Sequence, residues 1–519
     1  MKKLITLAAI VLLAGTAGFA QKPMGIDSTF GKNGYAMQIP SVNGSHYGGI
    51  CLGKNDTVFL TGYTDGSDEN LFIIKKDSKG QNVGTFGTNS QVTLDPLLGA
   101  DDRGKSIYQL PDGKLLVCGS MTGMNDLDIF LSRHNEDGTI DATFSNNGMS
   151  HFNMIGNDGV VKMIVSDGKV YIGTHSTVNS KYTDAYIIRM NMDGTLDQTF
   201  GTMGFVTIDP NNGDMETLYD FVVAKDGSII AVGRTQTQAF VTKMYMCKIT
   251  KSGKIDLTFG NNGYYIHTEA GFTRLTCVKI APDNSIFWGG YHEVNSLNVA
   301  LMLKMDSDGK LNSTFGSGNG KVSLNMAAQT EQVIRAIYIL QDGRIFVAGA
   351  KQTMGSPNVG FTAIFEKNGN LNTGYHGTGF HLAPVPDSAA EFVFEHIAMR
   401  SDSQLVVSGV YIDSVFKYGV FVTRFKNEPP PVNSVNNIAT ADYSANVYPN
   451  PSAGTFSVKT DGGYEVKAVN ISDISGKQVA GWTNAQDSYT VPTNIPNGLY
   501  YISISFEDGV ENRKLILNR

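Results

Sequence analysis

The sequence predicts an all-β protein built from seven repeated units, and three observations support that prediction. First, a variant of Gly-x-Leu/Ile-Asp-x-Thr-Phe-Gly-x-x-Gly occurs seven times, at intervals of 56 to 60 residues. A fixed period of this size indicates one structural unit per repeat. In chain order, the aromatic residue of the motif is Phe30, Phe86, Phe144, Phe200, Phe259, Phe315 and Tyr375.

Second, a turn of the Asp-Gly or Asn-Asp type is followed by a short apolar run and, in each repeat, by a glycine. Gly and Asn tolerate the positive φ that tight turns require, so each copy is expected to close a hairpin. The glycines that end this second motif are Gly62, Gly119, Gly173, Gly233, Gly290, Gly349 and Gly409.

Third, each repeat holds four short stretches rich in Val, Ile, Phe and Tyr, without helical periodicity. The first stretch precedes the hairpin turn and the second follows it. The third leads into the Phe motif and the fourth follows that motif. Four strands in each of seven repeats predict a seven-bladed β-propeller over residues 21–426.

The phase of the repeats predicts how the ring closes. The chain enters on a fourth-type strand, residues 35–39, and leaves on a third-type strand, residues 420–425. We therefore expect the last blade to take three strands from residues 392–426 and its outer strand from the N-terminus. Such closure removes the exposed sheet edge that an open array would leave.

The repeated aromatic residue is expected to pack between neighbouring blades, beside glycines in positive-φ turns. The Asp that precedes it is expected to cap a turn through its side chain. Val83, Asn312 and Asn372 depart from this Asp. A motif repeated seven times favours a structural role over a ligand site.

The N-terminus has the pattern of a secretory signal peptide over residues 1–20. Lys2 and Lys3 precede an apolar run, which small residues follow up to Ala20. No other segment reaches the apolar length of a membrane span. The net charge of -7 is spread along the chain, which argues against nucleic acid as a partner and gives no patch for an anionic membrane.

No cofactor or metal is predicted. The four cysteines match no zinc or redox spacing, so buried free thiols are favoured over bridges of Cys51 with Cys118 or Cys247 with Cys277. The segment 306–309, Asp-Ser-Asp-Gly, and its equivalents at 135 and 191 resemble the start of a calcium loop. They lack the downstream Glu and stand where each repeat needs a turn, so a turn is favoured over a metal site.

The composition changes after the repeats. Residues 427–446 hold three consecutive prolines and many Asn, Ser and Ala, which predicts a linker. Residues 447–519 contain short alternating strands separated by Pro, Gly and Asn turns, which predicts a small Ig-like β-sandwich.

This last module carries several short motifs in order along the chain. Their residues are Tyr448, Pro449, Asn450, Pro451, Gly454, Phe456, Ile471, Gly476, Asn497, Gly498, Tyr500 and Lys514. With these motifs the module resembles the type A C-terminal sorting domain of the type IX secretion system of Bacteroidota. The resemblance implies export through the periplasm and across the outer membrane, recognition of residues 447–519 by the secretion machinery, and their removal between about residues 431 and 446. The alternative is an Ig-like binding domain that stays attached.

The repeat itself resembles the delta-60 repeat of secreted bacterial β-propellers, from Gly25 to about Lys426. Copies two and seven depart most, through Val83 and through Tyr375-His376. This resemblance implies a fold and no particular chemistry.

Propeller geometry indicates where a ligand site would lie. The loops from fourth to first strands and from second to third strands share one face, around the channel mouth, and they vary while the Phe-motif face is repetitive. The candidate binding residues are polar residues at the start of the inner strands. The alternative for each is an exposed strand end with an ordinary charge. The candidates are Arg103, Lys105, Lys162, Tyr219, Arg274, Arg335, Glu395 and His396.

No hydrolase, zinc-protease or phosphate-loop motif is found in the sequence. The favoured function is therefore a non-enzymatic, secreted or surface-displayed propeller that binds protein or glycan. One alternative is an enzyme acting on an extracellular polymer, with Asp101, Asp102 or Glu395 as acids at the channel mouth. The other is a structural surface component without a discrete ligand.

Overall fold

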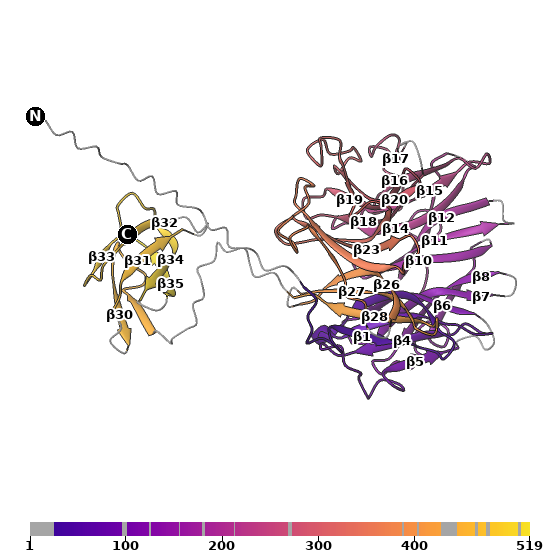
Figure 1. The fold of residues 1–519 in the computed structure, drawn as a ribbon, viewed down its shortest axis with the longest axis horizontal. Coiled ribbons are helices and arrows are strands. Elements are labelled where there is room, and N and C mark those ends of the chain that lie inside the picture. The colour runs from indigo at the N-terminus through magenta and orange to yellow at the C-terminus, as the bar shows by residue number, and fades with distance from the viewer. Residues whose placement is uncertain are drawn as a thin grey trace, which may run out of the picture. The chain divides into compact units, whose positions relative to one another are not determined.

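The computed structural model describes residues 25–95, 101–123, 126–154, 156–178, 182–211, 213–267, 272–386, 389–401, 404–426, 444–461, 465–473, 478–506 and 510–519. These residues form two compact units that divide between residues 427 and 428 (Figure 1). The predicted signal peptide and the predicted linker up to residue 443 lie outside the described residues.

The first unit is a β-propeller of antiparallel four-stranded blades, which confirms the predicted fold class. Its strands form five separate four-stranded sheets and one eight-stranded sheet, in which a single parallel pairing of Val359 with Phe392 joins the last two blades. Blades one to four are β2 (Ser45–Leu52), β3 (Val58–Thr64), β4 (Leu71–Lys76), β5 (Gln91–Leu94); β6 (Asp102–Gln109), β7 (Leu115–Thr122), β8 (Leu127–His134), β9 (Met149–Phe152); β10 (Asn157–Ser166), β11 (Lys169–Val178), β12 (Tyr182–Asn191), β13 (Phe205–Ile208); and β14 (Met215–Val223), β15 (Ile229–Gln236), β16 (Thr242–Ile249), β17 (Tyr264–His267).

Blades five to seven follow the same order from the inner to the outer strand. They are β18 (Thr273–Ile280), β19 (Ile286–Val294), β20 (Leu297–Met305), β21 (Lys321–Leu324); β22 (Thr330–Ile339), β23 (Ile345–Thr353), β24 (Val359–Phe365), β25 (Phe380–Leu382); and β26 (Ala389–Met399), β27 (Leu405–Asp413), β28 (Tyr418–Arg424), β1 (Tyr35–Gln38). A short 3-10 turn, η1 (Lys54–Asp56), is also present.

The N-terminal strand closes the ring, as the phase of the repeats predicts. Strand β1 pairs antiparallel with β28, from Tyr35 opposite Thr423 to Gln38 opposite Val420. In addition, β2 of the first blade contacts β26, β27 and β28 of the seventh. The blade that spans the two ends of the repeat region is therefore complete, and its outer edge is covered.

The Phe motif forms a contact between blades that is more elaborate than packing alone. Asp197 Oδ1 accepts hydrogen bonds from the backbone N–H and the hydroxyl of Thr199, at 3.1 and 2.6 Å, so it caps the turn as predicted. Its Oδ2 accepts from Arg189 Nε at 2.9 Å, and the Arg189 guanidinium lies 4.5 Å from the ring centre of Phe200. Arg189 also donates to the Lys251 carbonyl of the next blade, at 2.7 Å.

A backbone hydrogen bond completes this contact. The amide that follows the aromatic residue donates to a turn carbonyl of the next blade, at 2.7 to 2.8 Å, in four copies. We call the carboxylate, its basic partner, the aromatic ring and this amide the inter-blade clasp. The four amide pairs are Gly31 to Lys79, Gly201 to Ser252, Gly260 to Asp308 and Gly316 to Asn368.

The basic partner stands eleven residues before the aromatic residue in each of these copies, so the pair can be recognised in the sequence by its constant spacing. Blade six lacks the basic residue and shows a compensating change. Ile364 takes its place, and the hydroxyl of Tyr375 bonds Thr362 Oγ1 at 2.7 Å instead. The basic residues at this position before the other aromatics are Lys75, Arg133, Arg189, Lys248 and Lys304, with Arg424 serving Phe30 across the ring closure.

The second unit is a two-sheet β-sandwich. Phe456, Val469, Ile471, Ile502 and Leu515 are buried between the sheets. One sheet has the order β29 (Ser444–Tyr448), β30 (Thr455–Asp461), β33 (Tyr489–Thr490), and the other has the order β32 (Gln478–Trp482), β31 (Ala468–Ser472), β34 (Gly498–Ser505), β35 (Val510–Leu517).

The Tyr-Pro-Asn-Pro segment of this unit covers the edge of β35. Asn450 Nδ2 donates to the Lys514 carbonyl at 2.6 Å, and its Oδ1 accepts from the Ile516 amide at 2.8 Å. The Tyr500 hydroxyl donates to the Pro496 carbonyl at 2.7 Å. These motif residues therefore shape the sandwich, while Gly476 lies outside the described residues.

Replacing Asp197 by Asn should destabilise the propeller by about 3 kcal/mol at pH 7, because Arg189 is left buried without its carboxylate. Burial opposes ionisation of Asp197, but hydrogen bonds from Thr199 and Lys169 and the Arg189 charge outweigh it and lower its pKa. The stabilisation by the ionised Asp197 carboxylate is thus fully present above the unfolded pKa of about 3.9 and is lost as the pH falls towards and through the folded pKa. Urea unfolding measured from pH 7 down to pH 3 should therefore show the difference in unfolding free energy between the wild type and Asp197→Asn becoming smaller.

The matched control is Asp308→Asn, which changes an exposed ion pair with Lys310. The side chains of Lys310 and Asp308 are 76% and 46% exposed, against 9% and 6% for Arg189 and Asp197. This control should leave the unfolding midpoint nearly unchanged. Equal losses in the two variants, or a penalty for Asp197→Asn that does not depend on pH, would contradict the clasp.

Candidate functional site

Every inner strand of the propeller carries a β-bulge at the equivalent position. A bulge adds one residue to a strand and changes the direction of its side chain. Four of the predicted site residues are themselves the added residue. The seven added residues are Gly48, Lys105, Val161, Tyr219, Thr276, Arg335 and Glu395.

The glycine that ends the second sequence motif lies against this bulge. A Cβ atom at Gly409 would sit 2.0 Å from the Val393 carbonyl oxygen, and five equivalent glycines show distances of 1.9 to 2.1 Å. Blade three differs, because Thr174 stands opposite Val160 there and Gly159 is in the inner strand. The glycine is therefore required for a close approach of two backbones. The five equivalents are Gly62, Gly119, Gly233, Gly290 and Gly349.

A pocket of about 330 Å³ opens between the first and seventh blades, at the ends of strands on the predicted loop face. It brings together three of the predicted residues, Lys105, Glu395 and His396. The complete lining is Ser45, His46, Tyr47, Gly48, Tyr63, Lys105, Glu395, His396, Val410 and Tyr418.

One wall of this pocket is a row of three rings. The ring of His46 is stacked between Tyr63 and Tyr418, with centroid distances of 4.6 and 6.0 Å. Lys105 Nζ lies 5.4 Å from the ring centre of Tyr63. Asp65 Oδ1 is 2.8 Å from His46 Nε2 and fixes that ring. The result is an apolar surface with a cation beside it, and Tyr418 is 42% exposed.

The other wall is polar. Tyr47 shares a hydrogen bond of 2.7 Å with Ser408 and meets the His396 ring edge to face at 5.3 Å. Burial raises the pKa of Glu395, and Arg335, whose Nε is 3.9 Å away, opposes that rise. His396 is exposed, although the inner strands crowd around it, and this desolvation, followed by the Lys162 charge, lowers its pKa.

The remaining predicted residues lie outside the pocket and mostly link side chains of different strands. Arg103 bonds Glu69, and Arg274 lies 5.1 Å from the ring centre of Tyr219. Lys162 Nζ bonds Asp220 Oδ1 of the next blade at 2.8 Å. Sequence reasoning missed the stacked rings, although Tyr63 stands at the end of β3, beside a second-to-third-strand loop of the kind predicted to form the site face.

Other candidate groups have structural roles or are deeply buried. Asp102 is fully buried and Asp101 pairs with Arg103 at 3.3 Å, so Glu395 is the one acid of the three proposed for catalysis that lines the pocket. Asp308 of the calcium-like segment accepts the Lys310 amide at 3.2 Å within its turn. All four cysteines are free, and burial raises the pKa of Cys51 to about 12.

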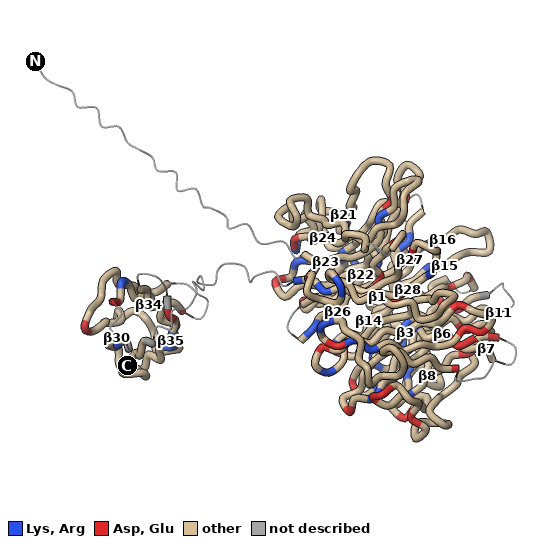
Figure 2. The backbone as a smooth tube through the Cα atoms, turned by 60° about the horizontal axis from the view of Figure 1, so that its bottom comes forward, with Lys and Arg blue, Asp and Glu red and all other residues tan. Residues whose placement is uncertain are grey.

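Charge and membrane features add little to the site. Basic and acidic residues are interspersed along the propeller backbone (Figure 2). Within the described ranges, no group of three or more His, Cys, Asp or Glu side chains is arranged to hold a metal ion. The described part of the chain also has no helix of the length and apolarity needed to cross a membrane.

Two family models match the chain. Residues 446–518 match the secretion system C-terminal sorting domain, and residues 110–144 and 166–200 match the family described as domain of unknown function (DUF5122) beta-propeller. Both propeller matches end at the aromatic residue of the Phe motif. The chain is therefore a β-propeller protein with a C-terminal sorting domain that directs export. No curated protein matches the sequence.

Solved structures with a similar fold have low identity. The polysaccharide lyase Uly1 is 10% identical with a TM-score of 0.45, covering 79% of this chain and 98% of that one. A protein of unknown function from Dyadobacter fermentans DSM 18053 is 10% identical with a TM-score of 0.41, covering 62% and 93%. The Penicillium chrysogenum alpha-L-arabinanase complexed with arabinobiose is 14% identical with a TM-score of 0.37, covering 75% and 96%. Similarity at this level assigns no activity.

Replacing Gly409 by Ala should destabilise the seventh blade by about 2 kcal/mol or more, because the new Cβ overlaps the Val393 carbonyl oxygen. The bulge that holds Glu395 would have to move with it. Gly84→Ala is the matched control, since a Cβ there meets nothing within 4 Å. Thermal unfolding of both variants provides the measurement, and equal midpoints would show that the bulge does not depend on this glycine.

Proposed function

We propose that this protein is an exported, non-enzymatic scaffold that binds an extracellular glycan at the pocket between blades one and seven. The observation that supports this most is the row of His46, Tyr63 and Tyr418 beside Lys105 and Glu395. Sites for small ligands combine apolar and aromatic walls with a few convergent polar groups. A pocket of about 330 Å³ has room for a single sugar ring and is small for a folded partner.

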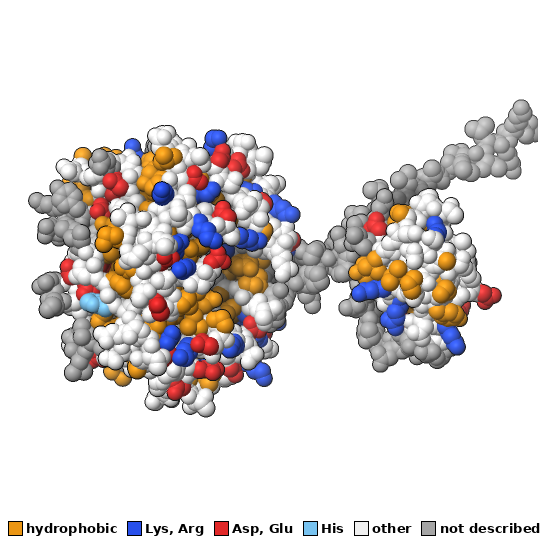
Figure 3. Space-filling model, turned by 180° about the vertical axis from the view of Figure 1, so that it is seen from behind, with side chains coloured by type: hydrophobic (Ala, Val, Ile, Leu, Met, Phe, Trp, Pro, Cys, Tyr) orange, Lys and Arg blue, Asp and Glu red, His pale blue; other side chains and the backbone are white. Residues whose placement is uncertain are grey.

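The loop face around the pocket carries many exposed apolar side chains, which favours contact with a larger ligand. Phe240 and Phe416 are 78% and 83% exposed, and both have positive φ, at 61° and 64°. Positive φ is unfavourable for a bulky residue, so Phe stands at two turns where Gly or Asn would be less strained. Figure 3 shows hydrophobic groups distributed among charges on one side of the propeller. The exposed apolar residues in these loops or at their ends are Val42, Phe240, Val241, Phe272, Val294, Met354, Leu382, Val385, Val415, Phe416 and Tyr418.

We propose a route of export in three steps. The N-terminal signal peptide, residues 1–20, takes the chain to the periplasm, and the type IX machinery recognises residues 447–519. Cleavage between about residues 431 and 446 then leaves the propeller at the cell surface or releases it. The match of residues 446–518 to the sorting-domain family supports the second step.

An enzyme acting on an extracellular polymer is the second candidate. One observation favours it: Glu395 lines an open pocket with its pKa raised by burial, as a general acid requires. If the protein is an enzyme, Glu395→Gln should abolish turnover, because Gln cannot donate the proton that a general acid supplies. If the protein only binds, the variant should still fold and there is no turnover to lose.

Replacing Tyr418 by Ala should weaken glycan binding by about 10-fold or more, since an exposed aromatic anchor is lost. Tyr108→Ala is the control, because Tyr108 is 36% exposed at the opposite end of an inner strand. A glycan array and a panel of cell-envelope polysaccharides, scored for both binding and cleavage, provide the measurement. No binding by the wild type, or equal binding by both variants, would contradict the proposal, and product release would favour the enzyme.

A further inference from the structure

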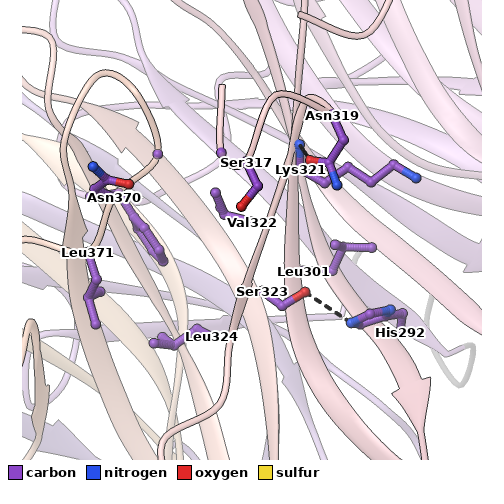
Figure 4. A pocket seen from close by; sticks show the side chains of 13 residues that line it. His292, Leu301, Ser317, Asn319, Lys321, Val322, Ser323, Leu324, Asn370 and Leu371 are labelled. Carbon is purple, nitrogen blue, oxygen red and sulfur yellow. Dashed lines mark hydrogen bonds between the residues drawn. The ribbon is translucent and has the colours of Figure 1, made fainter. Parts of the chain in front are cut away.

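A groove recurs on the outside of the propeller, between the outer strand of one blade and the third strand of the next. Between blades five and six it encloses about 450 Å³, and Figure 4 shows Leu324 and Leu371 lining it. Between blades seven and one it encloses about 580 Å³. The second groove is lined by Met37, Gln38, Ile39, Pro40, Lys76, Asn82, Thr88, Asn89, Gln91 and Thr93.

The two grooves differ at three equivalent positions. Strand pairing makes Gln38, Lys76 and Asn82 the counterparts of Leu324, Phe365 and Leu371. The Lys76 position is buried in every blade, and its other occupants are His134, Met190, Ile249, Met305, Phe365 and Phe425. The Asn82 position is otherwise always Ile or Leu: Ile26, Ile140, Leu196, Ile255, Leu311 and Leu371. Three positions that are mostly apolar in the repeat are thus polar together in this one groove, with His134 and His267 as the polar residues at equivalent positions of other blades.

These three residues bond one another. Lys76 Nζ donates to Gln38 Oε1 at 2.7 Å and also to Asn82 Oδ1. Gln38 Nε2 donates to Gln91 Oε1 at 2.8 Å, and Gln91 Nε2 donates to the Pro40 carbonyl at 2.8 Å. Lys76 is 3% exposed, and among the described residues neither an ion pair nor a third hydrogen bond of its ammonium is found.

A buried ammonium bonded only by neutral amide oxygens lacks compensation for its charge. Removing a cation from water costs several kcal/mol unless a negative group is near. Burial lowers the pKa of Lys76 to about 8, and no carboxylate opposes that shift. An ammonium has three donors, so one N–H remains for a ligand in the groove.

We propose that the groove between blades seven and one binds the oxyanion of a ligand through Lys76. The oxyanion supplies both the third acceptor and the missing negative charge. The amide and hydroxyl groups around Lys76, on Asn89 and Thr88, can hold the polar remainder of the ligand. A sugar carboxylate and a phosphate share this chemistry, and the test below separates them. This site is distinct from the pocket at the channel mouth, so a failure of glycan binding at that pocket would leave the proposal for Lys76 untouched.

The test uses the full chain, with D-glucuronate, inorganic phosphate and uncharged D-glucose as probes in NMR titrations of the lysine side-chain resonances. The Lys76 resonance should move on addition of an anion, and its pKa should rise. Lys76→Met should reduce the affinity by about 10-fold or more, since a charge-assisted hydrogen bond is lost. Met190 and Met305 occupy the equivalent position in other blades, so this variant is expected to fold. Lys321→Met, on the wall of the groove in Figure 4, is the matched control.

A response to glucuronate alone supports a sugar carboxylate, a response to phosphate alone supports a phosphate, and a response to both supports the shared oxyanion. No response of the Lys76 resonance to either anion overturns the proposal. So does a response to glucose equal to that for glucuronate, or binding that Lys76→Met leaves unchanged. If that variant misfolds, the wild-type titration of the Lys76 resonance alone decides.

Discussion

The inter-blade clasp is the interaction on which this propeller depends. A blade is a small twisted sheet that cannot bury both of its faces alone, so each must be fixed to its neighbours. In the clasp, one buried carboxylate caps a turn and holds an arginine or lysine over the aromatic ring. In four copies, an amide from the same turn reaches a carbonyl of the next blade. Polar and apolar contacts therefore act at the same point of the junctions whose turn carries Asp, whereas Val83, Asn312 and Asn372 replace that Asp in the other three copies.

The clasp also explains why the two ends of the propeller differ. Because the clasp occupies the face with the turns between third and fourth strands, that face repeats with little change. The opposite face carries none of these contacts and is free to vary, and both the stacked rings of the pocket and the strained Phe240 and Phe416 lie there. The bulges make the inner strands a second variable region, since an added residue such as Lys105 or Glu395 leaves the ladder intact on either side.

Repetition made the fold predictable from the sequence, and departures from repetition made the sites hard to predict. Seven copies of two motifs determined the number of blades, and the phase of the repeats determined that β1 completes the last one. The clasp arginine was missed because Arg189 and Phe200 are on separate elements, although the spacing of eleven residues is constant. The bulge glycine was found in the sequence as the end of the second motif, but the reason that glycine is needed there is a carbonyl oxygen of another strand, which the sequence does not show. Lys76 appeared in the sequence as part of an ordinary strand, and only the strand register places it at an apolar position of the repeat.

Native-state hydrogen exchange of the clasp amides tests this account most directly. Gly201, Gly260 and Gly316 each donate to the next blade, so they should exchange only when the ring opens. The account predicts slow exchange at all three, with the same opening free energy, close to that for global unfolding. Exchange as fast as that of exposed turn amides, or opening free energies that differ widely from blade to blade, would contradict the claim that the clasp holds the ring together.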